Sequence, residues 1–414
     1  MNITIQTFLD IIKAALAGRK PHITREISQE EWQRLFQLAG LHNVLPLIYE
    51  AVYTLPELQK HPALLASMKR QIRQLVILQT MRTTDFLKLN RHMQAAGIRP
   101  LVVKGIVCRN LYPLPDHRPS SDEDVLIAPA ESEACHLLLT EFGMQTAETP
   151  ETRAEAYEVP YQKADSPLYI ELHKHLFPPE SDAYGDLNRF FENVRDRAVA
   201  LEIQGTTVWT LGYTDHLFYL ICHAFKHFLH SGFGIRQVCD ILLFAQAYGS
   251  RIDWSQVLKN CRAIHADKFA AAVFQIGSRH LGFDAEKASY PPIWQDIAVD
   301  ELPMLADLLS GGLYGDASLS RKHSSNITLD AVAARKQGRK TKGALLTSVF
   351  PSAAKLENRY PYLEKHPYLL PVAWCSRLWQ YARETAHTPG SKASAALKIG
   401  NERIALLRMY EIIE

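Results

Sequence analysis

The sequence predicts an α+β fold in which a small mixed sheet with helices is embedded in a mainly helical protein. Both ends of the chain carry apolar residues at helical spacing, whereas residues 98–210 contain short apolar runs with the alternation typical of strands. The 414 residues are 47% hydrophobic and 22% charged, which is the composition of a globular chain. This length and composition exclude wholesale disorder and predict two or three domains.

The N-terminal segment, residues 1–97, is predicted to be helical throughout. Ser28 followed by Glu31 is the capping-box pattern that begins a helix. Residues 62–96 contain no glycine or internal proline, so they predict one long helix.

The α+β core is predicted over residues 98–210. A Lys-Gly turn ends its first strand, and a helix is expected over 131–142. The last four strand-like runs form two pairs, each joined by a short polar turn, and predict two antiparallel hairpins. The strand-like runs are residues 98–103, 122–127, 157–162, 168–173, 199–203 and 206–210.

The rest of the chain is predicted to be helical again. A helical domain that packs on the core is expected over 211–315, and a C-terminal helical segment over 346–414. Between them, residues 316–345 carry seven Lys and Arg residues against two Asp, which predicts a mobile basic loop.

Charge and cysteine usage limit the class of protein. Lys+Arg number 46 and Asp+Glu 44, so the net charge of +2 excludes a general nucleic-acid binder but leaves room for a local basic groove. The six cysteines include no Cys-x-x-Cys pair and predict reduced thiols. The sequence contains no apolar run of membrane-spanning length and its start does not resemble a signal peptide, so we expect a cytoplasmic protein.

Three acidic residues in the core are candidates for metal ligands. Asp122 and Asp124 are two residues apart, so on an extended strand they share one face. Adjacent carboxylates repel each other unless a cation lies between them, and Mg²⁺ prefers oxygen ligands. Glu171 lies within another apolar run predicted to be a strand. Acidic residues are disfavoured in strands, so this carboxylate is also a candidate ligand.

The turn before this strand is a candidate phosphate site. Gly105 follows a strand and begins a helix, and such a turn can present backbone N–H groups to a phosphate. Lys104 and Arg118 are candidate cations for contact with the phosphates or with an acceptor.

The arrangement of these residues resembles the motifs of the polymerase-β-type nucleotidyltransferase superfamily. More narrowly, they are similar to a family of uncharacterised bacterial nucleotidyltransferase-like proteins, and the resemblance spans about residues 30–380. The matching motifs are Lys104-Gly105, Tyr112-Pro113, Arg118, Asp122/Asp124, Glu171 with His173, His223 with His227, Arg236 with Asp240, the GGLYG turn at 311–315 and the run at 350–374.

The resemblance implies a polymerase-β-like core and transfer of a nucleoside monophosphate from an NTP to a hydroxyl, with release of pyrophosphate. It implies two Mg²⁺ or Mn²⁺ ions held by Asp122, Asp124 and Glu171, with Glu171 also a candidate base for the acceptor hydroxyl. Gly105 would contact the β- and γ-phosphates. Lys104 stands beside it where the superfamily usually has a Gly-Ser turn, and would supply a positive charge in place of the serine hydroxyl.

The two histidines that the resemblance adds, His173 and His227, are candidates for the catalytic cleft. His173 follows Glu171 by two residues and shares its face of the strand.

Three alternatives remain open on the sequence. The first is a non-catalytic nucleotide- or ligand-binding module, which the missing turn serine favours. The second is an RNA-directed transferase, tRNA-modifying or toxin-like, which the basic segment favours and the low net charge disfavours. The third is a zinc hydrolase on His223 and His227, which have the i, i+4 spacing of zinc ligands but lack the HExxH glutamate.

Overall fold

The computed structural model describes residues 2–230, 232–311, 319–338, 353–356, 360–376, 379 and 393–414. Contacts between Cα atoms divide the chain into two compact units. Unit 1 comprises Met1–Ala224 and Gly234–Leu302, and unit 2 comprises Phe225–Phe233 and Pro303–Glu414. The GGLYG turn, apart from Gly311, lies outside the described residues.

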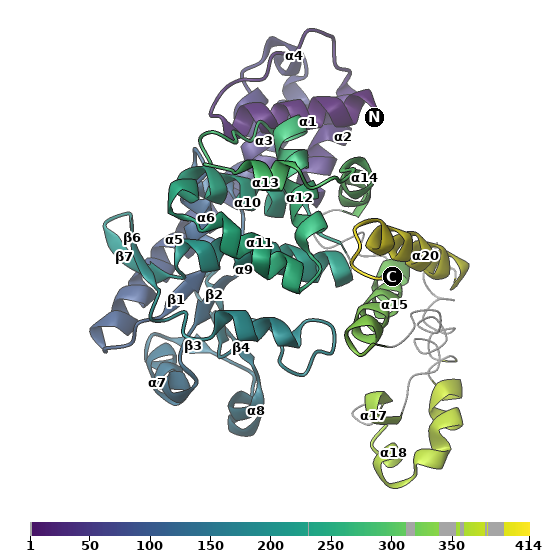
Figure 1. Ribbon diagram of the computed structural model, residues 1–414. Coiled ribbons are helices and arrows are strands. Elements are labelled where there is room, and N and C mark those ends of the chain that lie inside the picture. Colours follow the sequence, from purple (N-terminus) through teal and green to yellow (C-terminus); the bar gives the residue numbers. More distant parts are fainter. Residues whose placement is uncertain are drawn as a thin grey trace. The chain divides into compact units, whose positions relative to one another are not determined.

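Unit 1 begins with helices, as predicted (Figure 1). The side chain of Ser28 accepts a hydrogen bond from the N–H of Glu31, so the predicted cap is present, but the Glu31 carboxylate turns to Arg25 instead of back to the cap. The long helix runs from a proline at its first position, where the missing N–H costs nothing. These helices are α1 (Ile3–Leu16), α2 (Gln29–Leu41), α3 (Leu45–Val52), α4 (Pro56–Gln59) and α5 (Pro62–Ala95).

A five-stranded mixed sheet forms the centre of unit 1, in the order β1-β2-β5-β4-β3. The β2–β5 pair is parallel and the other neighbours are antiparallel. This is the small mixed sheet that the sequence predicted, and β4 with β5 is the first expected hairpin. The strands are β1 (Leu101–Val103), β2 (Glu123–Leu126), β3 (Met144–Gln145), β4 (Glu158–Lys163) and β5 (Tyr169–His173).

The second expected hairpin is a separate two-stranded sheet, β6 (Val199–Ile203) with β7 (Thr206–Thr210). It contacts β1, where the Thr210 hydroxyl donates to the carbonyl of Val102. Three helices accompany the central sheet: α6 (Gly105–Arg109), α7 (Ser132–Glu141) and α8 (Pro150–Glu155).

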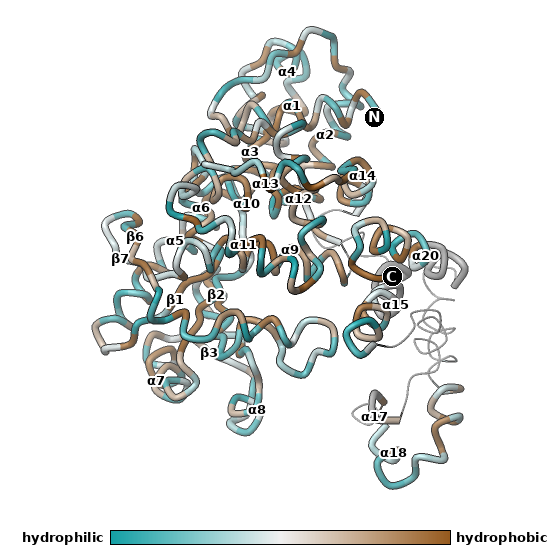
Figure 2. The backbone as a smooth tube through the Cα atoms, viewed as in Figure 1, coloured by the Kyte–Doolittle hydropathy of each residue, from teal (hydrophilic) through white to brown (hydrophobic). Residues whose placement is uncertain are grey.

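Further helices follow within residues 211–315, where a helical domain was predicted, and Figure 2 shows hydrophobic residues concentrated along α9 and around β1 and β2. Every residue of β1 and β2 is buried, so the centre of the sheet is part of the core. These helices are α9 (Tyr213–His230), α10 (Ile235–Tyr248), α11 (Trp254–Ala263), α12 (Asp267–Ile276) and α13 (Pro292–Gln295).

In unit 2 the prediction of a mobile basic loop is wrong for residues 319–336, because they form the helix α15 (Leu319–Lys336). Its apolar face packs against α20 (Ala393–Met409), and Ala331 and Thr328 are fully buried. Tertiary burial therefore overrides the polar composition of the segment. The other helices of this unit are α14 (Leu302–Gly311), α17 (Ala353–Leu356) and α18 (Tyr362–Lys365).

None of the described helices has the length and apolar character needed to cross a membrane. The two compact units do not test the predicted domain borders at 97, 210, 315 and 345, because each unit combines two separate stretches of the chain. These borders stay predictions.

Candidate functional site

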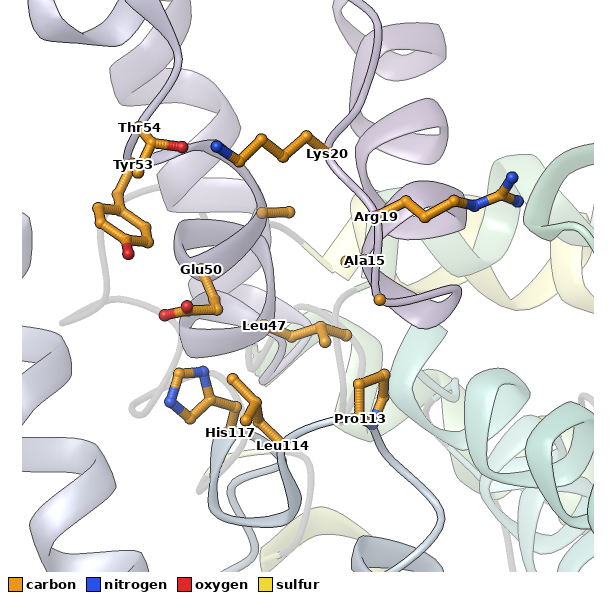
Figure 3. Close-up of a pocket in the computed structure, with 12 residues that line it drawn as sticks. Ala15, Arg19, Lys20, Leu47, Glu50, Tyr53, Thr54, Pro113, Leu114 and His117 are labelled. Atoms are coloured by element: carbon orange, nitrogen blue, oxygen red, sulfur yellow. The ribbon is translucent and has the colours of Figure 1, made fainter.

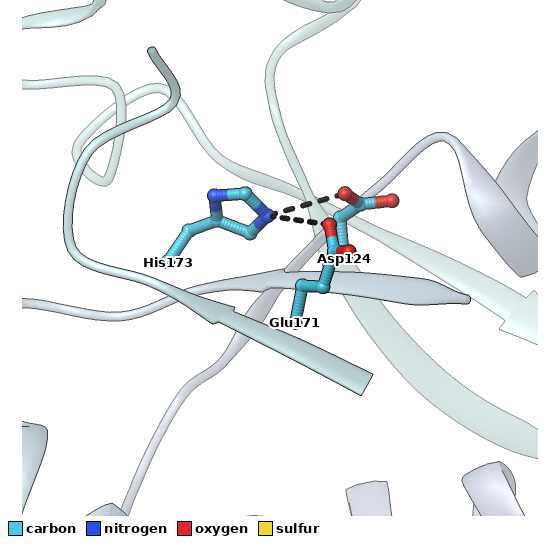
Figure 4. Close-up of side chains that lie close together, drawn as sticks. All are labelled: Asp124, Glu171 and His173. Atoms are coloured by element: carbon cyan, nitrogen blue, oxygen red, sulfur yellow. Dashed lines mark hydrogen bonds and ion pairs between the residues drawn. The ribbon is translucent and has the colours of Figure 1, made fainter. Parts of the chain in front are cut away.

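Two neighbouring parallel strands bring the predicted carboxylates together. Asp124 on β2 is the register partner of Glu171 on β5, and partners on parallel strands point to the same face of a sheet. His173 lies two residues further along β5 and joins them (Figure 4). Ligand atoms of Asp124, Glu171 and His173 all lie within 4.8 Å of one another. We call these three residues the acidic cluster.

His173 is the cationic member of the acidic cluster. Its Nε2 lies 3.1 Å from Asp124 Oδ1 and 3.7 Å from Glu171 Oε2, and its Nδ1 lies 3.6 Å from Glu158 Oε2. Burial disfavours the imidazolium, but the hydrogen bonds to Asp124 and Glu171 outweigh it and raise the pKa of His173 to about 9. His173 therefore carries a proton at neutral pH, which a bound metal ion would displace.

Lys104 is the second cation beside Asp124. Its Nζ lies 2.9 Å from Asp124 Oδ2 and 3.9 Å from Asp122 Oδ2. Burial opposes its charge, yet the two aspartates hold the pKa of Lys104 well above its usual value. Each carboxylate oxygen of Asp124 thus faces a protein cation, and Asp122 reaches the same site through Lys104.

Lys104 also adopts an unusual backbone conformation, with φ 49° and ψ −118°. A non-glycine residue at positive φ is uncommon and costs about 1–3 kcal/mol, so the surrounding contacts must hold it. The backbone N–H of Lys104 donates to Nε2 of His216, at 3.2 Å.

His216 anchors this turn to β1 and β7. The Thr210 hydroxyl donates its proton to Val102 O, so Nδ1 of His216, 3.0 Å from Thr210 Oγ1, must be the protonated ring nitrogen. Its Nε2 is then free to accept from Lys104. Complete burial lowers the pKa of His216 to about 3, which keeps the ring neutral.

This neutral histidine predicts a specific loss of stability in acid. The unfolded pKa is about 6.5, so the contribution of His216 is complete above pH 6.5 and falls by about 1.4 kcal/mol per pH unit as the pH drops toward 3. In His216→Gln, whose amide can replace both hydrogen bonds, the free energy of unfolding should fall less steeply with acid. Urea titrations of both proteins between pH 7 and pH 4 test this; parallel curves would contradict it.

Glu123, which the sequence analysis did not select, explains why the Lys-Gly turn requires a glycine. A Cβ on Gly105 would lie 2.0 Å from Oε2 of Glu123, and Gly105 has φ +35°. The same oxygen accepts from the N–H of Ile106 at 2.7 Å, while Oε1 pairs with Arg109 at 2.5 Å. The buried carboxylate of Glu123 therefore already accepts from the Ile106 N–H, so this N–H is not available to a phosphate. Phosphate binding by Gly105 itself stays a prediction.

Arg118 pairs with a buried carboxylate of α10. It is 3% exposed, and its Nε and Nη2 pair with the two carboxylate oxygens of Asp240 at 2.7 and 2.5 Å. Tyr112 donates its hydroxyl proton to the same carboxylate at 2.8 Å. These motif residues fasten the loop that leads to Asp122 onto α10. The predicted contact of Arg118 with a phosphate or an acceptor stays a prediction.

The histidines of α9 do not form a zinc site with the described residues. Among those residues, the acidic cluster is the only group of three or more His, Cys, Asp or Glu side chains with metal-ligand spacing. His227 falls in unit 2, so its predicted role beside the carboxylates stays a prediction.

Unit 1 also contains a pocket of about 380 Å³ between the N-terminal helices and the Pro113–His117 loop. Lys20, Glu50 and His117 are among its lining residues (Figure 3). None of the predicted site residues lines it, and we assign it no part in the chemistry.

Sequence pattern alone could have suggested the buried pair beneath the turn. Glu123 lies between the two aspartates, so on a strand it must face the opposite side, where a carboxylate needs a cation. Arg109 lies in an otherwise apolar helix and is that cation. The role of His216 had no such signal, because only the fold brings it to Lys104.

Comparison with known proteins identifies a family for the chain. No curated protein matches the chain. A family model described as "Uncharacterised nucleotidyltransferase" matches residues 28–282, which is more than half of the 414 residues and includes the acidic cluster, Lys104 and Asp240. The chain belongs to this family of uncharacterised nucleotidyltransferases.

Proposed function

We propose that the protein transfers a nucleoside monophosphate from an NTP to a hydroxyl of an acceptor, with a divalent metal ion, Mg²⁺ or Mn²⁺, at the acidic cluster. Membership of the family supports nucleotidyl transfer in general. The observation that carries the finer proposal is the register pair Asp124–Glu171, which sets two carboxylates side by side next to Asp122.

The residues present fit such an ion. Two carboxylates and one imidazole within 4.8 Å of one another supply oxygen and nitrogen ligands. Asp124 is 2% exposed, so its carboxylate is buried and its charge has to be balanced by cations beside it. When bound, the ion would supply positive charge against the phosphate and the attacking oxygen.

The protein's own residues account for the remaining requirements. The acceptor oxygen forms a bond to the α-phosphorus, the bond from that phosphorus to the bridging oxygen breaks, and pyrophosphate leaves with the electron pair. Glu171 is the candidate acceptor of the hydroxyl proton, because its carboxylate lies beside Asp124 and its lowered pKa keeps it ionised. Lys104 places a fixed positive charge beside the aspartates, where phosphate oxygens would lie.

Calorimetric titration with a panel of NTPs and Mg²⁺ or Mn²⁺ tests this proposal. We expect the wild type to bind one NTP only with metal, and Asp122→Asn/Asp124→Asn to lose that binding while its circular dichroism is unchanged. Asp284→Asn/Glu286→Gln is the matched control, because it removes an exposed acidic pair of the same spacing.

The outcomes separate the alternatives. Binding together with pyrophosphate release in the presence of candidate acceptors supports the transferase. Nucleotide binding without release under any acceptor supports the non-catalytic module, and release that requires RNA and weakens steeply with salt supports the RNA-directed enzyme. Failure of the wild type to bind any NTP contradicts the proposal.

A further inference from the structure

The two sides of Asp124 are built differently. On the Oδ1 side lie Glu171 and His173, both of which offer ligand atoms. On the Oδ2 side lies Lys104, whose ammonium offers three donors and no lone pair, so it cannot be a metal ligand. Both sides of the carboxylate therefore face a protein cation, but only the imidazole of His173 has a nitrogen that can become a ligand when a metal ion displaces its proton.

Lys104 is held in this position by more than its charge. Its backbone has the positive φ that disfavours any residue but glycine, and the neutral ring of His216 fixes its N–H. The buried Glu123 holds the next turn of chain through Ile106. A solvent-exposed surface lysine would not need a strained backbone or these buried hydrogen bonds. The Lys104 side chain is only 16% exposed.

The ammonium lies beside the oxygens through which a second ion could be shared. Nζ of Lys104 is 3.9 Å from Oδ2 of Asp122 and 2.9 Å from Oδ2 of Asp124, so an ion bound through these two oxygens would meet the ammonium. A second divalent ion there would displace the lysine or lie against its positive charge, which is strongly unfavourable in a buried site.

We propose that the Lys104 ammonium takes the place of one of the two cations at this site, so that each chain binds a single divalent ion at Asp124, Glu171 and His173. This inference rests on the proposed function and changes the number of ions that the resemblance implies from two to one. The lysine would neutralise the aspartates permanently, and the single ion would be the exchangeable charge.

The count of bound Mn²⁺ ions tests the inference. Free Mn²⁺ is measured by electron paramagnetic resonance during titration of the protein, alone and with a non-hydrolysable α,β-methylene analogue of ATP. We expect one ion per chain for the wild type and two for Lys104→Met with the analogue, because methionine keeps an unbranched side chain but ends one atom short of the ammonium and carries no charge. Lys60→Met is the control, since this exposed lysine pairs with exposed Glu26, and should bind one ion.

His173→Gln provides a second variant that does not depend on Lys104→Met being folded. It should weaken the single Mn²⁺ site at least tenfold, because it removes the nitrogen ligand. Two ions on the wild type, one ion on folded Lys104→Met, or unchanged affinity in His173→Gln would each overturn the inference. Absence of any bound ion would overturn the metal dependence of the proposed function as well, so the two failures are distinguishable.

Discussion

Asp124→Asn is expected to lower the rate of nucleotidyl transfer at least about 1000-fold, which is the largest effect on activity that the structure predicts. Both oxygens of this carboxylate contact cationic groups, Lys104 on one side and His173 on the other. The substitution removes the charge that holds both of them and the proposed metal ion. Single-turnover rates on whichever NTP the wild type binds measure the loss.

Glu171→Gln and Glu158→Gln make this prediction specific. Both carboxylates lie within 4 Å of His173, but only Glu171 belongs to the acidic cluster. Glu171→Gln should therefore lower the rate by two orders of magnitude or more, and Glu158→Gln by about tenfold or less. Equal effects of the two substitutions, or Asp124→Asn within tenfold of the wild type, would contradict the assignment.

Glu123→Gln is expected to lower the free energy of unfolding by about 3–5 kcal/mol, the largest effect on stability. Both Glu123 and Arg109 are fully buried, so the substitution leaves an uncompensated guanidinium in the core. The amide oxygen can still accept from Ile106, so the loss reports mainly on the charge. Urea unfolding followed by circular dichroism measures it.

A double substitution separates the charge effect from general damage. Arg109→Met/Glu123→Gln removes both charges, and we expect it to be more stable than Glu123→Gln alone, because replacing both partners of a buried pair avoids the unpaired charge. Glu26→Gln removes an exposed partner of Lys60 and should change stability by less than about 1 kcal/mol. A double variant no more stable than Glu123→Gln would show that the loss has another cause.

The parts of the fold that local pattern decides were predictable. The long helix Pro62–Ala95 follows from a stretch without helix breakers, and the hairpin of β6 and β7 from two alternating runs around Gln204-Gly205. The segment at 319–336 was not, because its polar composition resembles a loop and only packing against α20 makes it a helix.

The candidate site shows the same division. Asp122, Asp124 and Glu171 could be selected because carboxylates are disfavoured in apolar strands unless they bind a cation. The resemblance to known transferases implied that they are metal ligands. The buried pairing of Arg118 could not be predicted, because a charged residue in a motif gives no sign of whether it faces a ligand or a buried partner. Its partner Asp240 is 122 residues away in sequence.

By itself, the sequence determined which residue types are available and where strands, turns and helices begin, because these depend on neighbours a few residues apart. Tertiary structure alone decided which charges meet. The parallel register of β2 and β5 places Asp124 beside Glu171, and the turn after β1 places Lys104 on the other side of the same carboxylate. Electrostatic energy depends on distances of a few ångströms between residues far apart in the chain, and only the folded backbone fixes those distances.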